Sequence, residues 1–260
     1  MSTIYEPQGR AREYSPLALN FYKGCTHGCI YCYVPPMFKR FNAQYNHEDC
    51  FSALDIKKLE QSARRMQGCG KQILLSFTGD PYCGVDDSAT ETVLKILNQY
   101  GHKVAILTKG GKRCLKHLSI FKEFGDRIKV GATLTFDNDE MSKGWEPGAA
   151  MPSDRINTLK ELSENGIKTW VSFEPVIYPE QSLRLLSAVA KIVDHVKIGK
   201  INNFRGWDKK IDWNDFLKKA VQICRAAELP FYIKADLRQF ADGVELSENE
   251  MNMDFLNSDI

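Results

Sequence analysis

The sequence lacks the features of a membrane or secreted protein. No apolar run approaches the length that spans a bilayer, and the start, Met-Ser-Thr-Ile-Tyr-Glu, has no signal-peptide architecture. A Gly-x-x-x-x-Gly-Lys-Ser/Thr phosphate loop and a Gly-x-Ser-x-Gly nucleophile elbow are also absent, which argues against P-loop nucleotide hydrolases and α/β-hydrolases. We therefore expect a cytoplasmic protein that has no membrane partner.

Basic residues are absent from the end of the chain. After Arg238 there is no Lys or Arg, whereas six acidic residues follow: Asp242, Glu245, Glu248, Glu250, Asp254 and Asp259. We expect this acidic tail, residues 239–260, to be solvated and either partly disordered or laid over the domain. The net charge of the whole chain is +2, which neither demands nor excludes a nucleic-acid partner, and no aromatic–basic recognition motif is present.

Three of the eight cysteines lie close together in the sequence. Cys25, Cys29 and Cys32 are spaced Cys-x-x-x-Cys-x-x-Cys, with Gly24 and Gly28 beside them. Thiolates are soft ligands that suit zinc or iron–sulfur clusters, and glycines permit the positive φ angles of a loop that folds around an inorganic core. Three thiolates on one loop can bind three corners of a cuboidal cluster and leave its fourth iron open. The alternatives are three buried cysteines, or a zinc site that lacks its fourth ligand.

The other five cysteines show no second metal-binding pattern. They are scattered along the chain and form no further Cys-x-x-Cys pair: Cys50, Cys69, Cys83, Cys114 and Cys224. Together with the size of the chain and the missing signal peptide, this distribution favours reduced thiols over a disulfide framework. A second cluster is therefore not expected.

The cysteine loop resembles that of a known family. Cys25, Cys29, Cys32 and the following Tyr33 are similar to the cluster loop of radical S-adenosylmethionine (SAM) enzymes. The wider run Asn-Phe-Tyr-Lys-Gly-Cys-Thr-His-Gly-Cys-Ile-Tyr-Cys-Tyr, together with Thr-Gly-Asp-Pro-Tyr at 78–82, resembles the spore photoproduct lyase-like branch. The resemblance implies a 4Fe–4S cluster whose open iron is chelated by SAM. It also implies a 5′-deoxyadenosyl radical, formed when the cluster reductively cleaves SAM, and a reductant such as flavodoxin or ferredoxin.

Apolar runs and helical patterns alternate along the chain. Strands are predicted at 17–21, 72–77, 103–107, 127–135, 168–173 and 195–198, with a candidate final strand at 231–233. Helices are predicted at 53–66, 88–100, 112–124, 153–165, 180–190 and 212–227. Pro35-Pro36 is interpreted as the end of the cysteine loop, because neither residue donates a backbone hydrogen bond.

Six strands that alternate with helices imply an α/β fold with a parallel sheet, either doubly wound or closed as a barrel. The resemblance implies a partial (β/α)6 TIM-type barrel with parallel strands and the cluster at their C-terminal ends. We expect one radical SAM domain over residues 1–260, in a monomer. Its parts are a lead-in at 1–16, a barrel core at about 17–203, a C-terminal helix and candidate strand at 204–238, and the acidic tail at 239–260.

Polar residues follow the second predicted strand, at an edge where α/β folds build their sites. Thr78, Gly79 and Asp80 occupy this turn. The resemblance implies that the turn meets the SAM amino group, with the Asp80 carboxylate receiving the ammonium and Gly79 allowing a close approach. Because Gly-Asp-Pro is also common turn chemistry, an ordinary turn is the alternative.

Further candidates follow the third and fourth strands. The resemblance implies that Lys109 holds the SAM carboxylate and that Thr133 or Thr135 binds the ribose. A solvated lysine and two core threonines are the alternative. Tyr33, directly after the third cysteine, is also expected to contact the cofactor.

Two glutamates precede prolines near the later strand ends. Arg155 is expected to lie near the cofactor, or alternatively to form an ion pair with Glu146 that braces a loop. Glu174, after the fifth strand, is a candidate contact for adenosine or substrate. Lys197, Lys200 and Asn202 at the sixth strand are read as solvated side chains of the rim. His27 is interpreted as a loop residue that supports the cysteines and does not itself bind metal.

The resemblance leaves the substrate open. Spore photoproduct lyase returns a hydrogen atom from a cysteine beside its second-strand SAM residue, and no cysteine lies around Ser76-Phe-Thr78 here. We favour a radical SAM enzyme acting on a nucleic acid or nucleotide, with a small molecule or peptide as the rival. Basic residues that follow strands could surround the barrel mouth: Lys109, Lys112, Arg113, Lys116, Lys197, Lys200, Arg205, Lys209 and Lys210. An iron–sulfur sensor or electron carrier and a zinc-stabilised binding module are the alternatives from other classes.

Overall fold

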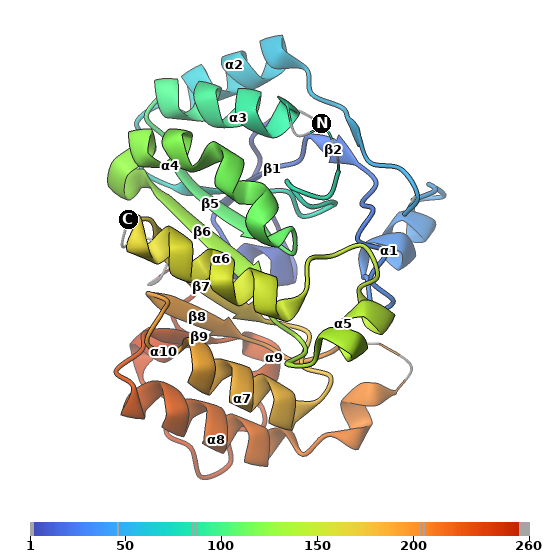
Figure 1. The fold of residues 1–260 in the computed structure, drawn as a ribbon, viewed down its shortest axis with the longest axis vertical. Helices are drawn as coiled ribbons and strands as arrows, with labels where there is room; N and C mark the ends of the chain where they lie inside the picture. The colour runs from blue at the N-terminus through green and yellow to red at the C-terminus, as the bar shows by residue number, and fades with distance from the viewer. Residues whose placement is uncertain are drawn as a thin grey trace.

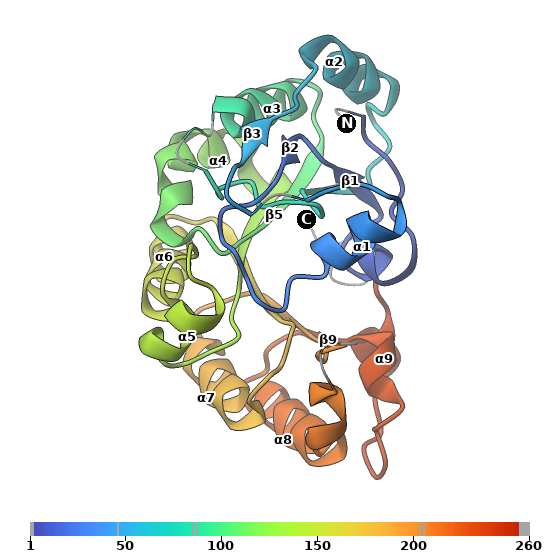
Figure 2. The same ribbon diagram turned by 90° about the vertical axis from the view of Figure 1, so that its right-hand side faces the viewer.

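Seven parallel strands form the central sheet of the computed structural model, which describes residues 3–45, 47–84, 86, 88–202, 204 and 206–254. In spatial order they are β1 (Leu17–Leu19), β4 (Gln72–Leu75), β5 (Lys103–Thr108), β6 (Ile128–Thr133), β7 (Lys168–Phe173), β8 (His195–Ile198) and β9 (Phe231–Ile233). Each neighbouring pair is parallel, and the sheet curls into part of a barrel (Figure 2). The predicted partial barrel is confirmed, and the candidate strand at 231–233 is the last strand of the sheet.

Helices connect the strands and cover the outside of the sheet (Figure 1). The predicted ones are α2 (Ile56–Arg65), α3 (Ser88–Gln99), α4 (Leu118–Phe124), α6 (Pro152–Glu164), α7 (Pro179–Val189) and α8 (Trp213–Ala226). The pattern at 112–124 begins as a 3-10 helix, Gly111–His117, before α4. Shorter elements were not predicted: α1 (Val34–Arg40), α5 (Asp139–Trp145), α9 (Ala235–Arg238), α10 (Glu248–Met251) and a hairpin of β2 (Tyr22–Lys23) and β3 (Phe51–Ser52).

Helix α1 starts directly after the cysteine loop. Pro35 and Pro36 lie in its first turn. The N–H groups of a first turn have no partner within the helix, so proline costs nothing there and its fixed φ suits the helix. The cysteine loop therefore ends at Pro35-Pro36 as predicted, but the helix that begins there was not predicted.

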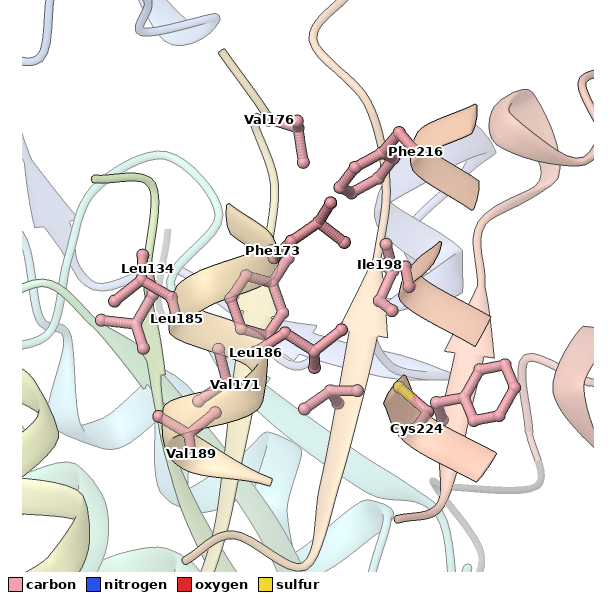
Figure 3. Packing of buried hydrophobic residues seen from close by; sticks show 14 of the residues in the cluster. Leu134, Val171, Phe173, Val176, Leu185, Leu186, Val189, Ile198, Phe216 and Cys224 are labelled. Atoms are coloured by element: carbon pink, nitrogen blue, oxygen red, sulfur yellow. The ribbon is translucent and has the colours of Figure 1, made fainter. Parts of the chain in front are cut away.

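The strands bury both of their faces. On the outer face Val171, Phe173 and Ile198 pack against α7 and α8, where Figure 3 shows Leu186 and Cys224. On the inner face Trp170 packs with Leu74 and Ala105. The Trp170 indole N–H donates to the Ile106 carbonyl at 3.0 Å. A Cβ at Gly131 would lie 2.5 Å from this indole nitrogen, so the barrel interior is filled by a tryptophan that requires a glycine beside it.

The lead-in connects the two edges of the sheet. Tyr5 forms a bridge with Ala18 of β1, at one edge. At the other edge the Glu13 carboxylate accepts hydrogen bonds from the Tyr232 hydroxyl at 2.8 Å and the Ala235 N–H at 2.7 Å. The Lys197 ammonium donates to the Glu13 carbonyl at 2.8 Å. The lead-in thus crosses from β1 to β8 and β9, so that its Glu13 and Tyr14 join the inner wall of the half-barrel.

The described part of the acidic tail lies over the domain. Arg12 binds both carboxylate oxygens of Asp254 at 2.7 and 2.8 Å. Arg225 of α8 pairs with Glu250 of α10 at 2.7 Å. Residues 255–260 of the predicted tail lie outside the described residues. No helix in the part of the chain that the structure describes is long and apolar enough to cross a membrane.

One pair of the remaining cysteines is bonded. Cys50, beside β3, is joined to Cys83 in the loop after β4. The expectation of reduced thiols is therefore wrong for this pair, while Cys69, Cys114 and Cys224 are free. The two partners are 33 residues apart, and only the packing of the hairpin against that loop brings them together.

Candidate functional site

The cysteine loop runs from β2 to α1. Cys25, Cys29 and Cys32 are free thiols, and each is partly exposed. Gly24 and Gly28 have φ angles of 81° and 61°, the left-handed region that the sequence predicted for a loop around an inorganic core. The loop therefore presents three thiols on a backbone that turns twice in eight residues.

A second loop packs tightly against the cysteine loop. The Gly148 N–H donates to the His27 carbonyl at 2.9 Å, and the Ile30 N–H donates to the Trp145 carbonyl at 2.9 Å. A Cβ at Gly148 would lie 1.9 Å from the Thr26 carbonyl oxygen, so only glycine permits this approach. Arg113 reaches the same place, with one nitrogen 3.1 Å from the Gly148 carbonyl. The cysteine loop is thus fixed from the side by the residues that follow α5.

The turn after β4 also touches the cysteine loop. A Cβ at Gly79 would lie 3.1 Å from the Gly24 carbonyl oxygen, so the two loops are in contact where both are glycine. Next to it, Asp80 Oδ1 accepts from Thr108 Oγ1 at 2.6 Å, and Oδ2 accepts from the Lys109 N–H at 2.8 Å. The sequence predicted that these strand ends meet, and the structure brings them together around Asp80.

His27 is buried in the cysteine loop, next to Asp80 and Arg113. The sequence predicted that it supports the loop and does not bind metal. Its Nδ1 is 3.5 Å from Asp80 Oδ2, and its Nε2 is 3.3 Å from an Arg113 nitrogen. Burial lowers the pKa of His27 to about 4, partly opposed by Asp80, and the charges of Lys109 and Arg113 lower it further. At neutral pH the imidazole is uncharged and links Asp80 to Arg113.

The three thiols carry shifted pKa values. Burial raises the pKa of Cys29 to about 11, while the Lys109 ammonium opposes the rise. Burial also raises the pKa of Cys25, with Asp80 next in effect and with smaller contributions from Cys29 and Cys32. These mutual effects place the three side chains within electrostatic reach of one another. Bound metal favours thiolates over thiols, so loading the loop releases protons.

The Lys109 ammonium lies on the inner side of the cysteine loop. It is 5.5 Å from the centre of the Tyr31 ring. Burial lowers the pKa of Lys109, but interactions with Cys29 in its thiolate form and with the carboxylates of Glu146 and Asp80 outweigh burial and raise it overall. A fixed positive charge therefore lies beside the thiols, where the anionic group of a ligand would also be attracted.

Arg155 and Glu146 form a buried ion pair behind the same loop. The Arg155 side chain is 0% exposed and contacts the Glu146 carboxylate, which also accepts from the Tyr31 hydroxyl. The other Arg155 nitrogens donate to the Ala150 carbonyl at 2.8 Å and the Thr133 carbonyl at 2.9 Å. Of the two expected roles for Arg155, this geometry favours the brace, because the guanidinium is occupied by the protein.

Several hydroxyls line the remaining strand ends. The Ser76 and Thr78 hydroxyls at the end of β4 are buried and have no hydrogen-bond partner among the described residues. Thr135 lies 3.4 Å from the Tyr31 hydroxyl, and Thr133 is buried above Arg155. The Tyr33 side chain reaches the segment after β4, where its hydroxyl donates a hydrogen bond to the Phe77 carbonyl. Unsatisfied buried hydroxyls are costly, so a polar ligand at this end of β4 would relieve them.

Glu174 lies at the end of β7, in a separate polar group. Its Oε2 accepts from the Tyr14 hydroxyl and from the Lys234 ammonium, both at 2.5 Å. A Cβ at Gly199 would lie 2.9 Å from the Glu174 carboxyl carbon and 3.0 Å from the Lys234 side chain, so this pair requires a glycine at the end of β8. Tyr14 and Lys234 were not predicted. Lys234 directly follows a predicted strand, and the rule that found Lys109 could have found it.

The sixth-strand lysines do not behave as expected. Lys197 is 1% exposed and Lys200 is also buried, so the prediction of solvated side chains is wrong for both. The Lys200 ammonium lies over the rings of Trp213 and Phe240, at 5.5 and 5.9 Å. Lysines can bury long apolar stems in this way, and strand periodicity alone does not reveal where the ammonium ends.

The residues present suit an iron–sulfur cluster in chemistry. The loop offers three free thiols, the soft ligands that such clusters use. The positive charge of Lys109 favours the thiolate form of Cys29, the form that binds metal. Among the residues that the structure describes, no three His, Cys, Asp or Glu side chains already surround one ion position. The fit therefore rests on the donor set and on the glycine turns of the loop.

Comparison with known proteins identifies relatives among uncharacterized proteins. The chain is 30% identical over 161 residues to an uncharacterized protein of Methanocaldococcus jannaschii, covering 61% of this chain and 60% of that protein. It is 26% identical over 188 residues to an uncharacterized protein of Acidianus two-tailed virus, covering 69% of this chain and 62% of that protein. The matches thus span about three fifths of the length of these relatives.

Solved structures share the fold. Streptococcus suis SuiB bound to SAM superposes with a TM-score of 0.64 at 18% identity, covering 89% of this chain and 53% of SuiB. A variant of spore photoproduct lyase superposes with a TM-score of 0.67 at 10% identity, covering 88% of this chain and 78% of the lyase. The family profile described as Radical SAM superfamily matches residues 19–192, which include the cysteine loop and the ends of β4 to β7. Since this match covers more than half of the chain, the protein belongs to the radical SAM superfamily.

Proposed function

We propose that Cys25, Cys29 and Cys32 hold a 4Fe–4S cluster and that the protein uses it to cleave SAM and start a radical reaction. The observation that carries the proposal is the contact of a loop bearing three free thiols with the turn at Gly79 and Asp80. When bound, the cluster would supply one electron to SAM, whose C5′–S bond would break to give methionine and a 5′-deoxyadenosyl radical that can abstract a hydrogen atom from the substrate. A one-electron donor such as flavodoxin or ferredoxin would supply that electron.

The chain's own residues bind and orient SAM on one side of the barrel mouth. Lys109 offers a fixed ammonium to the SAM carboxylate, supported by its raised pKa. The free hydroxyls of Ser76 and Thr78 offer donors at the end of β4, and Thr133 or Thr135 lies next along the sheet. Both oxygens of Asp80 accept hydrogen bonds from the chain, so Asp80 acts on SAM chiefly by fixing the Lys109 backbone.

The substrate is proposed to occupy the opposite side of the mouth, at the ends of β7 to β9. Glu174 is held there through one oxygen by Tyr14 and Lys234, in a pair that Gly199 makes room for. A carboxylate fixed in this way is a directed acceptor for an N–H or O–H group of the substrate or of adenosine. Trp170 fills the barrel interior and the lead-in covers one side of it, so both would keep water away from the radical at the mouth.

A nucleic acid or nucleotide is the proposed substrate, acted on by a single domain in a monomer. Spore photoproduct lyase has been solved with a dinucleoside spore photoproduct, and SuiB has been solved with its precursor peptide. The two neighbours therefore support a nucleic-acid substrate and a peptide substrate alike. Because no cysteine lies near Ser76, we do not propose that this protein catalyses the lyase reaction itself. Arg205, one of the predicted basic residues of the mouth, lies outside the described residues.

Removing the proposed SAM contacts is expected to weaken SAM binding and leave the cluster in place. Lys109→Ala should cost about 1.5–3 kcal/mol of binding free energy, the usual value of a charge-assisted hydrogen bond. Asp80→Ala should also weaken SAM binding, because it releases the Lys109 backbone that the carboxylate holds. Lys112→Ala is the matched control, because Lys112 is exposed and lies three residues further on. The measurements are SAM affinity by equilibrium dialysis, reductive SAM cleavage and iron content. Unchanged affinity in both variants would remove these residues from the site.

A further inference from the structure

Aromatic rings are exposed beside the barrel mouth. Phe41 is 78% exposed and Tyr33 is 58% exposed, although rings of this size are usually covered in a soluble protein. They lie at the two ends of α1, about 12 Å apart along the helix axis at 1.5 Å per residue. We name residues 33–47, apart from position 46, the α1 ledge.

The α1 ledge is basic. Lys39 and Arg40 are exposed in the last turn of α1, between the two rings. No acidic residue occurs from position 33 to position 47. The two adjacent positive charges are thus flanked by aromatic residues on both sides, with Phe38 before them and Phe41 after them. The expectation that the chain holds no aromatic–basic recognition motif missed this stretch, because Pro35-Pro36 was interpreted as the end of a loop.

The ledge is attached to the site by its other aromatic residues. The Tyr45 hydroxyl donates to the Thr78 carbonyl at 3.2 Å, and His47 Nδ1 lies 3.2 Å from the Cys25 carbonyl. Rings of Phe38, Tyr45 and His47 pack edge to face at 5.2 and 5.1 Å between centres. In the view of Figure 2, α1 lies in front of the curled sheet, between β1 and β9. A polymer bound along the ledge would therefore extend to the residues of the barrel mouth.

We propose that the α1 ledge binds single-stranded nucleic acid and leads it to the barrel mouth, an inference that rests on the proposed nucleic-acid substrate. Exposed rings separated by about 12 Å of helix can each stack on a different base of one strand. Lys39 and Arg40 between them neutralise backbone phosphates. A duplex hides the faces of its bases, so the rings gain nothing from double-stranded DNA or RNA.

The test compares two triple variants of the reconstituted protein. Lys39→Ala/Arg40→Ala/Phe41→Ala removes the two charges and one ring of the ledge and touches no residue assigned to cluster or SAM. Ile56→Ala/Lys57→Ala/Lys58→Ala on α2 is the matched control, because it removes one exposed apolar side chain and two exposed lysines elsewhere. The probes are fluorescein-labelled 15-mers of oligo-dT and oligo-U, and a 15-base-pair DNA duplex, titrated from 50 to 200 mM salt.

The single strands should bind more tightly than the duplex. The ledge variant should bind them at least about tenfold more weakly, the usual effect of one lost stacking ring. Its slope of log affinity against log salt should fall by about 1.4, or 0.7 for each of two lost phosphate contacts. The control variant should bind within about twofold of the unaltered protein, the margin set by substitutions outside the interface.

Three results would overturn the inference: no single-strand binding at 50 mM salt, equal binding by the ledge variant, or equal loss for duplex and single strand. If flavodoxin-driven SAM cleavage falls in the ledge variant while oligonucleotide binding is unchanged, the ledge is a reductant surface and the inference is wrong. Dithionite-driven SAM cleavage is measured alongside. Its absence in the unaltered protein would contradict the proposed function, independently of the ledge.

Discussion

Alanine at Cys25, Cys29 or Cys32 is expected to abolish cluster assembly. Each thiol is one of only three on the loop, and the ligand count fixes the coordination of the cluster. After anaerobic reconstitution, iron and sulfide per chain should fall to a small fraction of the amount in the unaltered protein. Because the thiols are partly exposed on a loop, the substitution leaves the sheet and its cores intact.

Cys69→Ala is the matched control for these variants. Cys69 is also a free cysteine, and its exposed position on a loop makes its removal structurally neutral. Iron content should therefore equal that of the unaltered protein. Full iron in Cys29→Ala, or loss of iron in Cys69→Ala as well, would contradict the assignment of the cluster to this loop.

Arg155→Met is expected to cause the largest loss of stability among single substitutions near the site. It leaves the Glu146 carboxylate buried without its guanidinium partner, and breaking a buried pair costs about 3–5 kcal/mol. For a chain of this size, such a loss lowers the melting temperature by at least about 6 °C. Arg184→Met is the control: Arg184 pairs with Asp137 at the surface, where pairs contribute about 1 kcal/mol or less.

The cost of Arg155→Met should depend on pH. Burial raises the pKa of Glu146, but Arg155 and Lys109 outweigh burial and hold this pKa below its ordinary value of 4.5. A lowered pKa stabilises the fold above pH 4.5, and this contribution is lost as the pH falls through the folded value. Without Arg155 the pKa of Glu146 rises, so the variant gains stability relative to the unaltered protein as the pH falls. Urea unfolding at pH 7 and pH 4 measures this, and an equal difference at both would contradict the account.

The strands and most helices could be predicted because their signals are local. Runs such as Ile73 to Leu75 are apolar on both faces, which is typical of a buried parallel strand. The signal for the cysteine loop was also local, since the three cysteines and two glycines lie in one short run of sequence. Residues that follow strands were found by the rule that parallel strands end at one edge.

What the sequence could not reveal depends on contacts between distant segments. The lead-in appeared irregular, yet Glu13 and Tyr14 complete the inner wall because β8 and β9 lie beside them in the fold. The disulfide of Cys50 and Cys83 likewise depends on the packing of a hairpin. For Arg155, the sequence permitted both a cofactor contact and a brace. Only its burial and its partners distinguish the two.

The most direct test of the central claim is SAM cleavage by the anaerobically reconstituted protein. Under dithionite, the protein should yield 5′-deoxyadenosine and methionine in equal amounts, with about four irons bound per chain in a 4Fe–4S cluster. A brown protein with full iron and no products would instead be an electron carrier or sensor. Bound zinc in place of iron would make the loop a structural site, and either result would contradict the account.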